Sequence, residues 1–227
     1  MRFSSDQIQR IGKEISSKVD GKTLFDEFSR GRYSTDASVY QIKPLGVVLP
    51  KDTNDVLNLM EYSQKNSIPL LARGGGSSQC GQTVGESVVL DYSKHQNKIL
   101  ELNVEEKYVW VQPGVVLDHL NSFLRPYGLW FPVDVSTSSR ATIGGMSANN
   151  SCGSRSLYYG NMVHNVLAIE AILDDGSLHT FDQINKNYLK TTNNQDRFYK
   201  IIDKFLNLRQ KVSKDIDENW PTTQRRV

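Results

Sequence analysis

The sequence predicts an α+β fold with two small sheets rather than a doubly wound parallel sheet. In the first half of the chain, short apolar strand-like segments alternate with amphipathic helical segments, which is typical of an α/β unit. Later strand-like segments are separated only by short polar turns, which predicts hairpins. The chain has 227 residues, 38% of them hydrophobic, enough for one large domain or two small ones that share a core.

Composition and targeting signals exclude several classes of protein. The 27 basic and 25 acidic residues give a net charge of +2, so no basic excess indicates a nucleic-acid partner. Residues 1–20 have no continuous apolar core like that of a signal peptide, and no apolar stretch approaches the length of a transmembrane helix. Cys80 and Cys152 fit no metal-binding spacing, and two reduced thiols are favoured over a disulfide. We therefore expect a cytoplasmic protein without a transmembrane segment.

Residues 1–43 are predicted to form an N-terminal helical segment. A helix that ends at Gly21 follows from apolar residues spaced three and four apart, namely Ile8, Ile11, Ile15 and Val19. The apolar residues of 24–28 predict a second short helix before Gly31. Both helices would precede the main domain.

Residues 44–181 are predicted to form that main domain, and residues 182–227 a helical linker toward a further domain. The apolar runs predict strands at 46–49, 70–72, 88–90, 99–102 and 108–112. A helix capped by Asp52 or Thr53 should follow the first strand, and Leu117, Leu120 and Leu124 mark another. The stretch 131–159 is predicted to be irregular, and 166–173 with 178–181 to form a hairpin. The last predicted helix carries Phe198, Ile201, Phe205 and Leu208.

A glycine-rich loop follows the second predicted strand directly. Gly74, Gly75 and Gly76 lack a Cβ, so their backbone can turn tightly and approach a ligand closely. Successive exposed N–H groups form a concave array of donors that suits phosphate oxygens. Arg73 and the neighbouring serines would add charge and further donors. The alternative is a flexible surface turn, which would need neither the preceding strand nor the hydroxyl groups.

The loop matches neither familiar nucleotide motif. Gly76–Thr83 has the spacing of the nucleoside triphosphate loop, but Gln82 replaces its phosphate-binding lysine. The dinucleotide pattern fails because Gln79 stands at its last glycine and no helix is expected to follow. The sequence therefore predicts a phosphate cradle of another type.

A second cluster of glycine, hydroxyl and amide residues spans residues 136–153. Small residues allow a flat ligand to lie against the backbone, while hydroxyl and amide groups satisfy its polar edge. Two such clusters, separated by a strand-rich span, indicate one large polar ligand with a planar part. Metal or hydrolase chemistry finds no support, because the histidines have no metal-ligand spacing and Asn149 replaces the last glycine of a G-x-S-x-G elbow.

Four ordered motifs resemble one protein family. They are 44–50 (PLGVVLP), 73–77 (RGGGS), 111–115 (VQPGV) and 141–145 (ATIGG). Together they resemble the FAD-binding domain of the flavoprotein oxidases typified by p-cresol methylhydroxylase and vanillyl-alcohol oxidase. Residues 32–38 and 159–160 are similar to the D-2-hydroxyacid dehydrogenase branch, which includes D-lactate dehydrogenase, glycolate oxidase and D-2-hydroxyglutarate dehydrogenase. The resemblance implies two small α/β subdomains with the cofactor between them.

The resemblance also implies which residues bind FAD. The pyrophosphate would be wrapped by Arg73, Gly74, Gly75, Gly76, Ser77 and Ser78, with Gly81 and Gln82 behind them. Pro113 and Gly114 would lie against the cofactor. The ribityl chain and the approach to the flavin ring would be lined by Pro132, Asp134, Ser139, Thr142, Gly144, Gly145, Ala148 and Asn149. Ile169 would offer backbone hydrogen bonds near the adenine.

Three positions qualify this transfer. Ser77 stands where covalent members have a histidine, which implies non-covalent FAD. Asn165 stands where the family often has an aspartate before the later strand, so the chain departs from the family pattern there. Asp134 has an alternative role as a turn-capping residue.

The implied reaction is oxidation of a D-2-hydroxy acid by hydride transfer to flavin N5. Similar proteins carry the substrate-binding arginine, the histidine and any metal site in a second domain. We therefore expect the catalytic residues to lie outside this chain, in a further domain or a partner chain, and the chain alone to have little activity. An electron acceptor is also required, and large relatives carry an iron–sulfur cluster elsewhere. The alternatives are a flavoenzyme like UDP-N-acetylenolpyruvoylglucosamine reductase, and a non-catalytic nucleotide-binding module.

Overall fold

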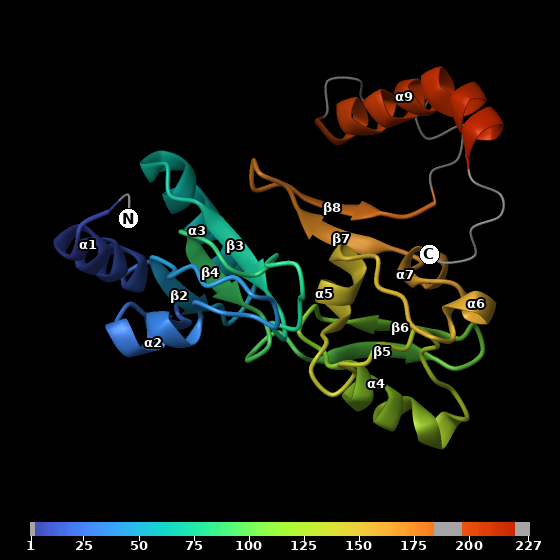
Figure 1. Ribbon diagram of the computed structural model, residues 1–227, viewed down its shortest axis with the longest axis horizontal. Coiled ribbons are helices and arrows are strands. Elements are labelled where there is room, and N and C mark those ends of the chain that lie inside the picture. Colours follow the sequence, from blue (N-terminus) through green and yellow to red (C-terminus); the bar gives the residue numbers. More distant parts are fainter. Residues whose placement is uncertain (1–2, 184–196, 221–227) are drawn as a thin grey trace. The chain divides into compact units, whose positions relative to one another are not determined.

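The computed structural model describes residues 3–183 and 197–220. The chain divides into an N-terminal unit, Met1–Asn165, and a C-terminal unit, Val166–Val227. Figure 1 shows the helices and strands of both units. The predicted boundaries after residues 43 and 181 stay predictions.

A four-stranded mixed sheet forms one part of the N-terminal unit. Its strands are β1 (Lys22–Leu24), β2 (Gly46–Leu49), β3 (Leu70–Arg73) and β4 (Val88–Asp91), in the order β1-β2-β4-β3. β2, β4 and β3 run parallel, and β1 pairs antiparallel with β2. Every residue of β2 and of β4 is buried, as expected for continuous apolar strands covered on both faces. The three parallel strands confirm the predicted strand, helix, strand and glycine-loop order.

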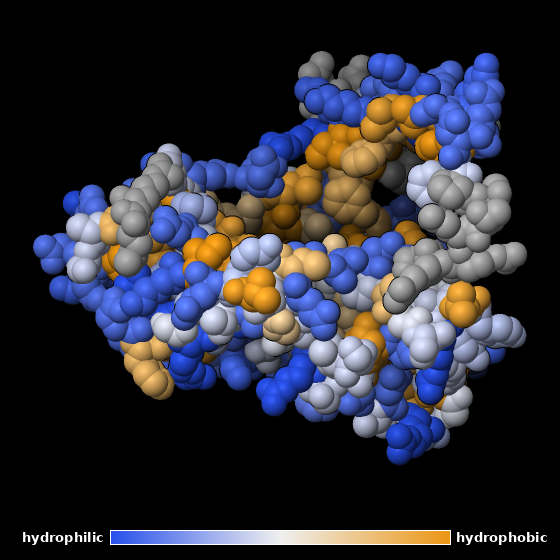
Figure 2. Space-filling view, in the orientation of Figure 1, coloured by the Kyte–Doolittle hydropathy of each residue, from blue (hydrophilic) through white to orange (hydrophobic). Residues whose placement is uncertain are grey.

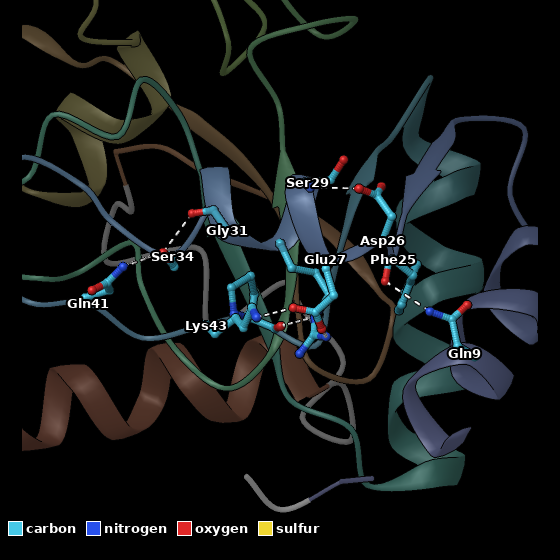
Figure 3. A network of polar contacts seen from close by, with 11 residues as sticks. Gln9, Phe25, Asp26, Glu27, Ser29, Gly31, Ser34, Gln41 and Lys43 are labelled. Atoms are coloured by element: carbon cyan, nitrogen blue, oxygen red, sulfur yellow. Dashed lines mark hydrogen bonds and ion pairs between the residues drawn. The ribbon is translucent and has the colours of Figure 1, made fainter. Parts of the chain in front are cut away.

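Three helices accompany this sheet. α1 (Ser5–Ser16) begins with a capping box between Ser4 and Gln7 and buries Ile8, Ile11 and Ile15, whereas Val19 lies beyond its end. α3 (Thr53–Asn66) connects β2 to β3, and Asp52 caps it through two backbone N–H groups. α2 (Glu27–Arg32) is capped by Asp26, which accepts from the Ser29 N–H (Figure 3).

Two details at the N-terminus differ from the sequence predictions. The first helix ends at Ser16 rather than at Gly21. Residues 22–24 form strand β1, so the second helix does not include Leu24. The reason is tertiary pairing, because Leu24 lies opposite Val47 at the edge of the sheet.

The other part of the N-terminal unit contains a hairpin and several short helices. β5 (Ile99–Asn103) and β6 (Tyr108–Val111) pair antiparallel, and α4 (Leu117–Leu124) follows, extended by the 3₁₀ turn η1 (Arg125–Tyr127). The stretch predicted to be irregular contains α5 (Ile143–Ala148) and α6 (Ser156–Tyr159), and α7 (Met162–Asn165) comes after it. That prediction was wrong for α5, because Thr142 caps a helix that its two glycines disfavour.

The C-terminal unit contains the predicted hairpin and a long helix. β7 (Ile169–Ile172) and β8 (Leu178–Phe181) pair antiparallel across a turn in which Gly176 has a φ of 83°. α9 (Arg197–Asn219) packs Phe198 against the rings of His179 and Phe181. Figure 2 shows apolar side chains on one side of this helix and polar ones on the other.

The α+β class is thus confirmed, with three sheets rather than two in the described residues. Across 3–183 and 197–220, none of the helices combines the length and apolarity needed to cross a membrane.

Candidate functional site

The glycine loop packs directly against the second cluster. A Cβ on Gly74 would lie 2.1 Å from Thr142 Oγ1, and a Cβ on Gly75 would lie 2.1 Å from the Arg140 carbonyl oxygen. No side chain fits in either place, so the missing Cβ atoms are what allow the two backbones to approach. Segments about 65 residues apart in the sequence therefore lie side by side, as the sequence predicted.

The backbone N–H groups of residues 74–79 form an unsatisfied array. None of them donates a hydrogen bond to any residue that the structure describes. Gly76 and Gly81 adopt positive φ angles of 65° and 73°, which only glycine adopts readily. A run of unpaired N–H groups along a turning backbone is suited to bind the oxygens of a phosphate.

The Pro113–Gly114 turn is joined to the second cluster by backbone hydrogen bonds. The Gly144 N–H donates to the Pro113 carbonyl oxygen at 2.9 Å, and the Ile143 N–H donates to that of Val115 at 2.8 Å. A Cβ on Gly144 would lie 2.5 Å from Pro113 Cβ. The first turn of α5 is thereby fixed against the end of the β5–β6 hairpin.

A side-chain bond joins the two glycine-rich segments at a second point. Gln82 Nε2 donates to Asn149 Oδ1 at 3.1 Å. Ser78 Oγ donates to Gln82 Oε1 at 2.6 Å and accepts from the Cys80 N–H at 3.1 Å. Gln82, which stands at the position of the phosphate-binding lysine, thus links the glycine loop to the second cluster.

Arg73 lies against the glycine loop and binds backbone carbonyl groups on either side of it: a Cβ on Gly76 would lie 2.5 Å from Arg73 Nη2. Its guanidinium donates to the carbonyl oxygens of Thr35 at 2.8 Å, Thr83 at 3.2 Å and Tyr33 at 3.4 Å. It also lies over the Tyr33 ring, 5.2 Å from the centroid. Burial lowers the pKa of Arg73, and the nearby Asp91 opposes that shift. A direct contact of Arg73 with a phosphate stays a prediction.

Asp134 anchors the loop that follows the second cluster. Its carboxylate accepts from Ser154 Oγ at 2.7 Å and from the Arg155 N–H at 3.0 Å. A Cβ on Gly153 would lie 1.8 Å from the Asp134 carbonyl oxygen, so the backbones touch. These bonds are those of the turn-capping alternative, and a contact of Asp134 with the ribityl chain stays a prediction.

We expect the Asp134 carboxyl to titrate below its ordinary pKa of 3.8. Burial raises the pKa, but the hydrogen bonds from Ser154 and from the Arg155 N–H stabilise the ionised form and outweigh it. Because the folded-state pKa is depressed, the stabilisation is present above the ordinary value and is lost as the pH falls through the depressed one. NMR titration should give a value below 3.8, and Ser154→Ala should raise it. A value at or above 3.8 in the unsubstituted chain would contradict this assignment.

The other predicted site residues divide by position. Close contacts join members of both clusters and the intervening turn, namely Gly74, Gly75, Gln82, Pro113, Thr142, Gly144 and Asn149. Gly145 donates its N–H to Thr142 Oγ1. Ser139 and Ala148 are exposed in the same segments, Pro132 is partly buried, and Ser77 and Gly114 lie in the loop and turn described above. Ile169 belongs to β7 of the C-terminal unit, so its proximity to adenine stays a prediction.

The histidines and cysteines have ordinary surroundings. His95, His119 and His164 are exposed, and His164 Nδ1 accepts from the Asn161 N–H. Cys80 and Cys152 are both exposed, and no disulfide joins them.

Asp36 is the site residue that sequence reasoning missed. It was assigned to a polar loop, yet its carboxylate accepts from Thr83 Oγ1 at 3.0 Å, at the end of the glycine loop. The only available signal was the Asp-x-Ser pattern of residues 36–38, because the Ser38 N–H donates to the same carboxylate. That pattern predicts a local turn but no partner 47 residues away.

The residues present fit a flavin nucleotide. The glycine loop packs its backbone closely against the second cluster, and its N–H groups have no acceptor among the described residues, so they can bind a diphosphate. The Asp36 carboxylate, at the end of the loop, is engaged by Thr83 and Ser38. The donor set therefore suits an anionic ligand of this kind.

Comparisons with known proteins agree with this geometry. Residues 44–182 match the model of the FAD binding domain family. The chain is 43% identical over 158 residues to D-2-hydroxyglutarate dehydrogenase of Haemophilus influenzae, covering 67% of this chain and 15% of that protein. It is 34% identical over 170 residues to glycolate oxidase subunit GlcD of Bacillus subtilis, covering 73% and 36%. The chain thus spans only a minor part of these relatives.

Solved structures show the same fold. An alkyldihydroxyacetonephosphate synthase superposes with a TM-score of 0.67 at 20% identity, over 81% of this chain and 36% of that one. The BBE-like 1 protein of Physcomitrella patens gives 0.66 at 20% identity, over 78% and 39%. These matches confirm the predicted FAD-binding fold, and with the family match they show that the chain belongs to the FAD binding domain family.

Proposed function

We propose that this chain is the FAD-binding part of a flavin-dependent oxidoreductase that oxidises a D-2-hydroxy acid. The observation that carries the proposal is the close packing of the two glycine-rich segments, together with N–H groups of residues 74–79 that have no acceptor among the described residues. The relatives named D-2-hydroxyglutarate dehydrogenase and glycolate oxidase subunit support the substrate class.

In this proposal the chain binds and orients the cofactor. The N–H groups of residues 74–79 hold the diphosphate, and the Pro113–Gly114 turn with the first turn of α5 holds the rest of the nucleotide. FAD itself supplies the acceptor for the substrate hydride. Ser77 offers no imidazole for attachment, so the cofactor is held without a covalent bond.

The groups that handle the substrate are proposed to lie elsewhere. Oxidation of a hydroxy acid needs a base for the hydroxyl proton and a cation for the carboxylate. We place both in a further domain or a partner chain, together with the electron acceptor. A cytoplasmic location is also proposed, and the exposed thiols of Cys80 and Cys152 favour a reducing compartment.

A titration with FAD tests the proposal. We expect the purified chain to bind one FAD, seen as a quench of flavin fluorescence, and to release it intact on acid precipitation. The bound flavin should not be reduced at a useful rate by D-lactate or D-2-hydroxyglutarate with this chain alone. A chain that binds no FAD would refute the proposal. Reduction by a nicotinamide donor without any hydroxy acid would favour the reductase alternative.

A further inference from the structure

Residues 34–41, here called the outer loop, pack against the glycine loop. Residues 34–41 lie before the matched region, which begins at residue 44. Their ends are joined by a bridge between Thr35 and Gln41 and by the Ile42 N–H, which donates to the Ser34 carbonyl oxygen at 2.8 Å. Gln41 Nε2 also donates to Ser34 Oγ (Figure 3). Lys43, which follows the loop, pairs with Glu27 of α2. The segment is therefore a closed loop with a fixed base.

The tip of this loop contacts the glycine loop at several points. The Ala37 N–H donates to the Gly76 carbonyl oxygen at 3.2 Å. Asp36 Oδ2 accepts from Thr83 Oγ1 at 3.0 Å and lies 3.5 Å from the Thr83 N–H. A Cβ on Gly81 would lie 2.6 Å from Tyr40 Cδ2. These contacts reach the middle and the far end of the glycine loop.

Arg73, at the start of the glycine loop, also binds both the outer loop and the end of the glycine loop. Its Nη2 donates to the carbonyl oxygen of Thr35, in the outer loop, and its Nη1 donates to that of Thr83. Thr83 is thus bound twice, by Arg73 through its carbonyl and by Asp36 through its hydroxyl. The two ends of the glycine loop are tied to each other and to residues 35 and 36.

We propose that Asp36 is a positioning residue that, together with Arg73, holds the glycine loop in the conformation that binds the FAD diphosphate. The inference rests on the proposed function. A run of glycines has many accessible conformations, and ordering it at the moment of binding costs affinity. A loop that is already fixed at both ends presents its N–H groups without that cost.

Two substitutions at Asp36 and one control test this role in the complete chain. Asp36→Ala removes the acceptor of Thr83, whereas Asp36→Asn keeps one oxygen that can accept. Asp52→Ala is the matched control, because Asp52 also accepts two backbone N–H groups, at the start of α3 rather than in the site. Amide hydrogen exchange of Cys80, Gln82 and Thr83, whose N–H groups have acceptors in the loop, is measured without FAD. FAD affinity is measured by fluorescence, and global stability by thermal unfolding.

We expect Asp36→Ala to speed exchange at residues 80, 82 and 83 and to raise the Kd for FAD about tenfold. The exchange rate and the Kd of Asp36→Asn should lie between those of Asp36→Ala and of the unsubstituted chain. Asp52→Ala should lower stability without changing either loop exchange or FAD affinity. Unchanged exchange and affinity in Asp36→Ala, or equal losses of affinity in Asp36→Ala and Asp52→Ala, would overturn the role. If the unsubstituted chain binds no FAD, the proposed function fails, and the exchange measurement alone still decides whether Asp36 orders the loop.

Discussion

Replacing Gly75 by alanine is expected to abolish most of the FAD affinity. The added Cβ would lie 2.1 Å from the Arg140 carbonyl oxygen and 2.9 Å from its carbonyl carbon. Both are backbone atoms and cannot rotate away, so the two glycine-rich segments must separate. Overpacking of this kind costs about 1–3 kcal/mol, and the resulting displacement should raise the Kd about 10- to 100-fold. Fluorescence titration of the variant with FAD measures the effect.

Gly31→Ala provides the matched control for that substitution. Gly31 lies in α2, and nothing lies within 4 Å of a Cβ built on it. Alanine in a helix stabilises by about 0.4–1 kcal/mol relative to glycine. FAD affinity should therefore be unchanged in Gly31→Ala. A Gly75→Ala chain that binds FAD as tightly as this control would show that the close approach is not needed.

Replacing Asp55 by alanine is expected to cost stability rather than affinity. Asp55 is 3% exposed. Its carboxylate accepts from the backbone N–H groups of Asp20 at 2.7 Å, Gly21 at 2.9 Å and Lys51 at 2.7 Å. It therefore joins α3 to the turn before β1 and to the end of β2. Hydrogen bonds to a charged group contribute about 1.5–3 kcal/mol each, so we expect the free energy of unfolding to fall by about 3 kcal/mol or more.

Denaturant unfolding measures the effect of Asp55→Ala, with Glu61→Ala as its control. Glu61 lies on the same helix, is exposed, and pairs with Lys65 one turn away. Such an exposed pair contributes little to stability, because solvent screens it. The folded Asp55→Ala chain should bind FAD normally, since Asp55 does not contact the glycine loop. A loss of stability no larger than that of Glu61→Ala would contradict this role.

The elements that could be predicted from the sequence are those whose pattern is local. β2 and β4 are short apolar runs that are buried on both faces, and the predicted bounds agree within one residue. α3 carries its own start signal in Asp52. β1 could not be predicted, because its three residues become a strand only by pairing with β2.

The site divides in the same way. The glycine-rich segments were recognisable because the chemistry lies in the backbone, and glycine marks where the backbone must come close. Helix α5 was missed because adjacent glycines disfavour a helix, whereas the cap from Thr142, the hydrogen bonds to residues 113–115 and the burial of Ile143 and Met146 stabilise it. The partnership of Asp36 with Thr83 joins residues 47 apart, so no local pattern encodes it.

The most direct test of the account is amide hydrogen exchange of the complete chain with and without FAD. If both glycine-rich segments hold one flavin nucleotide, FAD should protect residues 74–83 and residues 139–149 together and leave α1 unchanged. Protection of only one of these segments, or of neither, would contradict the convergence on which the proposed function depends.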